Sequence, residues 1–239
     1  MPDEAPCQFH EAPDALTLAQ DLAHFVAARL QEGLSQRGQA LLVVSGGSTP
    51  VPFFQALAQT ALDWPRVSIT LADERWVPPD HADSNERLVR AHLLQGLASQ
   101  ARFVPFKSAD ALAVQGVPKL EATLQALLWP ADVVVLGMGA DAHTASLFPG
   151  SPQLAEALDD ARTARCLAIT APSLPNVPVD RISLSKRALL DTRHTVVHIT
   201  GSAKRLLLAQ ARLPGPEGTM PIRLAWCRAN IPCHVFYSN

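Results

Sequence analysis

The stretch that decides the fold is Ala40-Leu-Leu-Val-Val-Ser-Gly-Gly-Ser-Thr-Pro50, in which five apolar residues run directly into a glycine-rich polar turn. Residues 40–44 carry no polar side chain on either face, which is typical of a parallel strand covered by helices on both sides. Residues 51–60 have a helical pattern, and Pro50 or Pro52 falls in the first turn, where proline is favoured. The stretch therefore predicts a strand, a glycine loop and a helix, the repeating unit of an α/β fold.

The same alternation extends in both directions along the chain. Asp14 can cap a helix whose apolar residues recur every three or four positions, and Asp83 with Glu86 can cap another. Further strands are predicted over residues 67–72, 102–106, 132–137, 166–170, 181–184, 194–200 and 233–237, and further helices over 118–128 and 202–212. We therefore predict a single domain over residues 1–239, with a doubly wound α/β fold whose mostly parallel sheet carries helices on both faces.

Composition narrows the classes of function. The chain has 239 residues and a net charge of −2, so no global positive field attracts nucleic acid or anionic lipid. No apolar run approaches the roughly 18 residues of a membrane span, and residues 1–6 do not begin a secretory signal. The four cysteines are unevenly spread and indicate neither a disulfide framework nor a zinc ribbon. We expect a cytoplasmic protein with no nucleic-acid or membrane partner.

Polar loops follow the most apolar strands, at the edge where α/β sheets bind ligands. The loop at residues 45–50 has two glycines that expose backbone N–H groups beside a helix amino terminus, an arrangement that favours phosphate. It matches neither the triphosphate nor the dinucleotide motif, so a sugar phosphate is the better prediction; a simple tight turn is the alternative. In the next loop Arg75 could form a two-pronged contact with phosphate or carboxylate, or else an internal ion pair.

The third loop places Asp141 and His143 two residues apart, directly after a strand and a glycine turn. Histidine is the usual general base near neutral pH, and a nearby carboxylate can orient its ring. The alternative is a histidine satisfied by a backbone group. The other seven histidines, including His194 and His198, are assigned to structural or surface roles.

Two further chemistries are weaker candidates for these loops. A metal site would need Asp73 to converge with the third loop, yet no pair has a helix-face metal spacing. A serine nucleophile would need a G-x-S-x-G elbow, and none surrounds the candidate serines Ser45, Ser48 and Ser146.

The chain resembles the 6-phosphogluconolactonases in an ordered set of motifs: Ser45-Gly-Gly-Ser-Thr-Pro50, Asp73-Glu-Arg75, Asp83-Ser-Asn85 and Gly137-Met-Gly-Ala-Asp-Ala-His-Thr-Ala-Ser-Leu-Phe-Pro-Gly150. The later segments Arg181-Ile-Ser-Leu-Ser and Thr200-Gly-Ser-Ala-Lys204 are also similar, so the resemblance spans about residues 10–238. It implies a single α/β domain, related to glucosamine-6-phosphate deaminases, that needs no metal or other cofactor. The implied reaction is hydrolysis of 6-phospho-D-glucono-1,5-lactone to 6-phosphogluconate, the second step of the oxidative pentose phosphate pathway.

The resemblance also implies roles for individual residues. His143 would activate the attacking water, with Asp141 beside it in the same loop. The residues that would hold the phosphate are Gly46, Gly47, Ser48, Thr49, Arg75 and Lys204, and those that match other pocket positions are Asp73, Asn85 and Arg181. The family usually has glycine where this chain has Ala142, and alanine at a positive φ costs roughly 1 kcal/mol.

Two rival functions follow from the same loops. One is an isomerase and deaminase acting on glucosamine 6-phosphate, but in those enzymes a glutamate that supports the histidine stands where this chain has Phe148. The other is a non-catalytic sugar-phosphate sensor, which would have no need of His143. We expect a small sugar-phosphate lactone as the partner and a monomer or weak homo-oligomer as the state of the protein.

Overall fold

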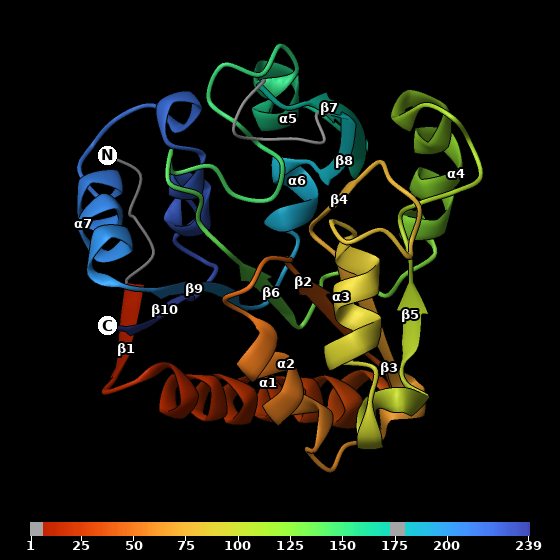
Figure 1. The fold of residues 1–239 in the computed structure, drawn as a ribbon, viewed down its shortest axis with the longest axis vertical. Helices are drawn as coiled ribbons and strands as arrows, with labels where there is room; N and C mark the ends of the chain where they lie inside the picture. Colours follow the sequence, from red (N-terminus) through yellow and green to blue (C-terminus); the bar gives the residue numbers. More distant parts are fainter. Residues whose placement is uncertain (1–6, 173–179) are drawn as a thin grey trace.

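A parallel sheet forms the centre of the computed structural model, which describes residues 7–172 and 180–239 (Figure 1). Its strands are β1 Cys7–Ala12, β2 Ala40–Val44, β3 Val67–Leu71, β5 Arg102–Val104, β6 Val133–Leu136, β9 Thr195–Thr200 and β10 Cys233–Ser238. They lie in the order β1-β10-β9-β6-β2-β3-β5, and every pairing between them is parallel. The predicted parallel α/β sheet is confirmed, with the edge strand β1 as an addition.

Helices cover both faces of this sheet, as predicted. The helices are α1 Ala15–Arg37, α2 Val51–Ala58, α3 Asn85–His92, α4 Ala113–Gln125, α5 Leu154–Leu158, α6 Lys186–Leu189 and α7 Ser202–Ala211. Helix α1 packs across β2 and β10 and against α2. The β2-to-β3 and β9-to-β10 crossovers run in opposite directions along the sheet, so their right-handedness puts α2 and α7 on opposite faces. Figure 1 shows α1 and α2 below the strands and α7 above them.

A second, smaller sheet was not predicted. It contains β4 Asp73–Arg75, β8 Asp180–Leu184 and β7 Cys166–Thr170 in that order, all antiparallel, and α4 packs against β7 and β8. The prediction of residues 73–75 as a loop is therefore wrong. Three residues are too few to show a strand period, and β4 exists because it pairs with a segment about a hundred residues later.

Two predicted helix starts also shift. Helix α4 begins at Ala113 rather than at Pro118, which lies inside the helix and leaves one carbonyl, that of Val114, without its N–H partner. The N-cap of α3 is Ser84, not Asp83: its Oγ accepts from Arg87 N at 3.1 Å. The Asp14 cap of α1 is confirmed, because its side chain accepts from Thr17 N at 2.8 Å.

The direction of the crossovers reverses between β2 and β6. From β2 the chain moves toward β3 and β5, whereas from β6 it moves toward β9 and β10. At such a point the loops leave on opposite faces, and a crevice opens beyond the carboxyl ends of the strands. Among the described residues, no helix is long and apolar enough to cross a membrane.

Candidate functional site

A cavity of about 260 Å³ opens at this reversal point. The loops after β2, β6 and β9 form one side of it, and the small sheet with the start of α3 forms the other. It is lined by all but one of the predicted site residues: Gly46, Gly47, Ser48, Thr49, Asp73, Arg75, Asn85, His143, Arg181 and Lys204. The remaining one, Asp141, contacts His143 from behind.

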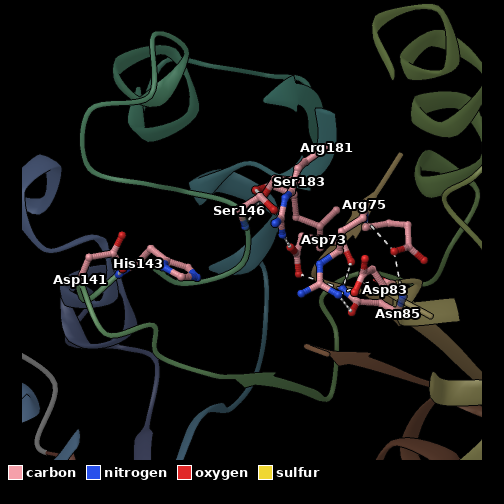
Figure 2. A network of polar contacts seen from close by, with 11 residues as sticks. Asp73, Arg75, Asp83, Asn85, Asp141, His143, Ser146, Arg181 and Ser183 are labelled. Carbon is pink, nitrogen blue, oxygen red and sulfur yellow. Dashed lines mark hydrogen bonds and ion pairs between the residues drawn. The ribbon is translucent and has the colours of Figure 1, made fainter. Parts of the chain in front are cut away.

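Asp141 and His143 form a hydrogen-bonded pair. The Nδ1 atom of His143 lies 2.5 Å from Asp141 Oδ1, which also accepts from the backbone N of His143 at 3.1 Å. Burial by itself raises the pKa of Asp141, but the hydrogen bonds and charge of His143 bring the pKa below its usual value. The ionised carboxylate holds the proton on Nδ1, so Nε2 remains able to accept one. Figure 2 shows the ring pointing from Asp141 toward the group around Asp73.

The backbone around this pair is tightly constrained. A Cβ on Gly139 would lie 2.1 Å from the His143 ring, so only glycine permits the ring to approach the loop this closely. Ala142, between the two polar residues, has a φ of 62°, and Ala145 has a φ of 48°. Ala142 therefore has the positive φ at which alanine is less stable than the family's usual glycine, by roughly 1 kcal/mol.

The glycine loop leaves the amino terminus of α2 without a side-chain cap. Val51 N already donates to the Ser48 carbonyl at 3.3 Å, so the start of α2 favours an anion through the helix dipole rather than through a row of free N–H groups. Gly46 has a steric role as well, because a Cβ at this position would lie 1.9 Å from Asn85 Oδ1. Gly47 has a φ of 99° and turns the loop toward Ser48, which is exposed at the cavity.

Two arginines border the cavity on adjacent strands. Arg75 and Arg181 are direct partners in the β4–β8 pairing, where like charges repel unless an anion or carboxylate offsets them. Burial lowers the pKa of Arg181, Asp73 partly offsets this, and Arg75 lowers it further. Nη1 of Arg75 donates to the carbonyl of Asp83 at 2.6 Å and to Asn85 Oδ1 at 3.3 Å. The buried Nε of Arg75 has no hydrogen-bond partner among the described residues. In the same part of the chain, Asp73 pairs with Arg181 and not with Arg75, so the internal ion pair considered for Arg75 is not found.

Asp73 ties the third loop to the small sheet (Figure 2). Its Oδ2 accepts from Ser146 Oγ at 2.5 Å and lies 4.0 Å from Arg181 Nη1, while its carbonyl accepts from Asn85 Nδ2 at 2.9 Å. The Ser146 hydroxyl is thus engaged by a carboxylate and not by a histidine, so it lacks the partner that a serine nucleophile needs.

Glu74 is a buried residue that the sequence prediction left without a role. Its carboxylate accepts from the backbone N of Arg75, Asn85 and Glu86 at 2.7, 2.8 and 2.8 Å. Burial raises its pKa, and these three hydrogen bonds oppose the rise. Glu74 therefore holds the start of α3 against β4, which sets the position of Arg75 and Asn85. Its place inside the Asp-Glu-Arg triplet is the only signal that could have drawn attention to it.

Lys204 and His198 complete the side of the cavity formed by β9 and α7. Lys204 Nζ donates to the carbonyl of Met138, and burial lowers its pKa against a raising influence of Asp141. His198 was assigned to a structural or surface role, yet it lines the cavity. In the described ranges, no group of three or more His, Cys, Asp or Glu side chains is placed to hold a metal ion.

Comparisons with known proteins agree on one family. Residues 13–232 match the profile of the family described as glucosamine-6-phosphate isomerases/6-phosphogluconolactonase. A 6-phosphogluconolactonase of Pseudomonas putida is 46% identical over 93% of this chain and 94% of its own, and one of Pseudomonas aeruginosa is 46% identical over 90% and 89%. The crystal structure of a 6-phosphogluconolactonase from Shewanella baltica OS155 is 43% identical, covers 98% of both chains and superposes with a TM-score of 0.94.

Proposed function

The chain belongs to the glucosamine-6-phosphate isomerase/6-phosphogluconolactonase family, and on this premise we propose that it hydrolyses 6-phospho-D-glucono-1,5-lactone to 6-phosphogluconate in the pentose phosphate pathway. The observation that carries the proposal is the position of a carboxylate-supported histidine opposite two arginines across one cavity. A lactone that bears a phosphate needs both: a base near the carbonyl, and cations at the other end.

His143 acts as the general base in this proposal. Its Nε2 takes a proton from water while the oxygen of that water attacks the lactone carbonyl. The tetrahedral intermediate then collapses, the bond between the carbonyl carbon and the ring oxygen breaks, and the ring oxygen receives the proton from Nε2. Asp141 stabilises the imidazolium that forms between these steps, because its carboxylate lies 2.5 Å from Nδ1. No covalent intermediate is needed.

The phosphate is held at the other end of the cavity. The backbone N–H groups of the glycine loop, the dipole of α2 and the side chain of Arg75 supply hydrogen-bond donors and positive charge, and Lys204 on α7 adds a further positive charge. Arg181 adds a second guanidinium directly beside Arg75, and Asp73 and Asn85 orient this pair within the pocket. Binding at this end positions the carbonyl near His143, so that binding energy contributes to the rate.

The proposed reaction is metal-independent. The Asp141–His143 pair supplies the base that a metal-bound hydroxide would otherwise supply, and the cationic side chains supply the electrostatic handle. Dialysis against a chelator should therefore leave the lactonase rate unchanged. A loss of rate that returns on adding a divalent cation would contradict this part of the proposal.

The deciding experiment follows acid release from freshly made lactone, with the spontaneous hydrolysis rate subtracted. His143→Ala is expected to lower kcat by about 10²–10⁴, the usual contribution of a positioned general base. His24→Ala, which removes an exposed histidine on α1, serves as the matched control and should keep full activity.

The deaminase alternative is tested in the same preparation. Phe148 occupies the place of the deaminase glutamate, and its ring centroid lies 4.3 Å from that of His143, where it can neither accept a proton nor bond the imidazole. We expect no ammonia release from glucosamine 6-phosphate. Steady release that disappears in His143→Ala would assign the chain to the other branch of the family, and a protein that binds the lactone without hydrolysing it would be the sensor.

A further inference from the structure

His198 is a buried polar residue that the proposed reaction does not use. It lies on β9, only 5% of its surface is exposed, and it lines the same cavity as His143. Neither ring nitrogen is hydrogen-bonded to a described residue, and Nδ1 is completely sealed from solvent. A buried imidazole without a partner is costly, and a valine or leucine would fill the position without that cost.

The surroundings keep this ring neutral. Phe53 meets it edge to face, with centroids 6.2 Å apart, and Phe236 is its neighbour on β10. Burial lowers the pKa of His198 to about 4, so near neutral pH the ring carries one proton and no charge. We place that proton on Nε2. A buried N–H at Nδ1 would have no acceptor, and this costs more free energy than a buried nitrogen lone pair that has no donor.

The position of His198 on β9 shows which parts of the cavity surround its ring. His198 follows Val197, the partner of Leu136, so it lies beside Gly137 at the start of the loop after β6. Phe53, which the ring contacts, is the third residue of α2, so the imidazole borders the uncapped helix amino terminus. Ser45 Oγ, at the end of β2, is a second buried polar atom without a described partner that borders this part of the cavity.

We propose that His198 binds the phosphoryl group of the substrate as a neutral donor, through Nε2–H, and so contributes to selectivity for phosphorylated lactones. This rests on the proposed function for the identity of the substrate but not for the presence of the anion site. A neutral donor suits a buried position, because it adds a hydrogen bond to an anion without the desolvation of a further cation.

The variants separate the hydrogen bond from packing. His198→Leu removes the donor and keeps an apolar side chain of similar size, while His198→Gln retains an N–H at the position of Nε2. His194→Leu is the matched control, since His194 immediately precedes the same strand and lies outside the cavity lining. Thermal unfolding of each variant identifies any that fail to fold.

The first measurement is kcat/KM on 6-phosphogluconolactone and on unphosphorylated glucono-δ-lactone. For His198→Leu, kcat/KM on the phosphorylated substrate is expected to fall about tenfold or more, which is the effect of losing one hydrogen bond to a charged group. KM should change more than kcat. The rate on the unphosphorylated lactone should stay within about twofold, and His198→Gln should recover most of the loss. Equal losses on both lactones, or no loss on either, would overturn the proposal.

The second measurement does not depend on lactonase activity. Inorganic phosphate is titrated into the wild type and the variants by calorimetry, and His198→Leu should bind it about tenfold more weakly than the wild type and His194→Leu. If wild type binds phosphate but hydrolyses no lactone, the proposed function fails while this test of His198 still stands. Phosphate binding that is identical in the wild type and His198→Leu would refute the role given to His198.

Discussion

Single side-chain atoms set the chemistry of this site. The distance of 2.5 Å between His143 Nδ1 and Asp141 Oδ1 decides which imidazole nitrogen is available, and the glycine at 139 permits that approach. On the opposite side, Arg75 keeps a buried Nε without a described partner while its Nη1 is anchored to the carbonyl of Asp83. In the proposed reaction, the end of the cavity at His143 accepts a proton and the end at Arg75 donates hydrogen bonds to the phosphate.

Replacing Arg75 by lysine tests whether the planar guanidinium matters. Lysine keeps the charge but cannot both hold the Asp83 carbonyl and present a second donor, so kcat/KM on the phosphorylated lactone should fall roughly tenfold or more. Arg87→Lys is the matched control, because Arg87 is exposed on α3. Steady-state kinetics on both variants checks the prediction, and equal activity would remove Arg75 from phosphate binding.

Ala142 offers a test of backbone strain inside the loop that carries His143. Ala142→Gly relieves roughly 1 kcal/mol of strain at φ 62° but removes a buried methyl worth about 0.8 kcal/mol, so the unfolding free energy should change by less than about 1 kcal/mol. Ala142→Val places a β-branched side chain in the same left-handed conformation. It should destabilise the protein by roughly 2 kcal/mol or more and lower kcat, which urea unfolding and the lactone assay measure. A Val variant as stable as the wild type would contradict the strain argument.

At the scale of elements, the small β4–β8–β7 sheet is what brings Arg75 and Arg181 to the cavity. Glu74 fastens β4 to the start of α3, and Asp73 fastens the same strand to the loop that carries His143. The two functional ends of the site are therefore joined by hydrogen bonds between elements distant in sequence. Changes in these ties should alter the rate even though they touch no reacting atom.

Ser146→Ala removes one such tie. It deprives the buried Asp73 carboxylate of a hydrogen bond of 2.5 Å, which should cost about 1–3 kcal/mol of stability. The loop bearing His143 loses an anchor, and a small displacement of a catalytic group commonly costs an order of magnitude in rate, so kcat should fall roughly tenfold with a smaller change in KM. Ser99→Ala, at an exposed position, is the control. An unchanged kcat in a destabilised Ser146 variant would show that the tie is purely structural.

At the scale of the whole molecule, the reversal of crossover direction between β2 and β6 explains why a cavity forms where it does. The loops diverge there, and the residues that line the space come from segments spread between positions 45 and 204. Because the site depends on the whole sheet being assembled, global stability and activity should be lost together on unfolding.

Acid should weaken the folded state through its buried histidines. Burial, with nearby positive groups, lowers the pKa of His234 to about 4, and burial lowers that of His198 to about 4, against 6.5 for an ordinary histidine. The folded state thus binds fewer protons than the unfolded chain, so this stability is complete above about pH 6.5 and is lost as the pH falls toward 4. Each group contributes at most about 3 kcal/mol to the loss.

Urea unfolding at pH 7 and pH 4.5 measures this effect. His234→Phe should reduce the difference between the two unfolding free energies, because phenylalanine fits the aromatic cluster with Phe25 and Phe236 and does not titrate. The exposed His24→Ala should leave the difference unchanged. A His234 variant with the same acid sensitivity as the wild type would show that another group is responsible.

Much of this protein could be predicted from local sequence. The five apolar residues before the glycine loop indicated a doubly covered parallel strand, and β2 is fully buried; the alternation that followed predicted most of the central sheet. The motif residues also predicted which side chains would gather at the carboxyl edge, because strand ends of a parallel sheet share one side. These inferences succeed because they depend on periodicity and on chemistry carried by neighbouring residues.

Only the tertiary structure decided how those residues face one another. The antiparallel pairing that sets Arg75 against Arg181, the bond from Ser146 to Asp73 and the entry of His198 into the cavity join positions far apart in the chain. The left-handed backbone of Ala142 is likewise held by hydrogen bonds: its N–H donates to the Gly139 carbonyl, and its carbonyl accepts from the N–H of Ile222. Such features arise from contacts between distant segments, which leave no local period in the sequence, so packing of the whole chain is the physical cause that determines them.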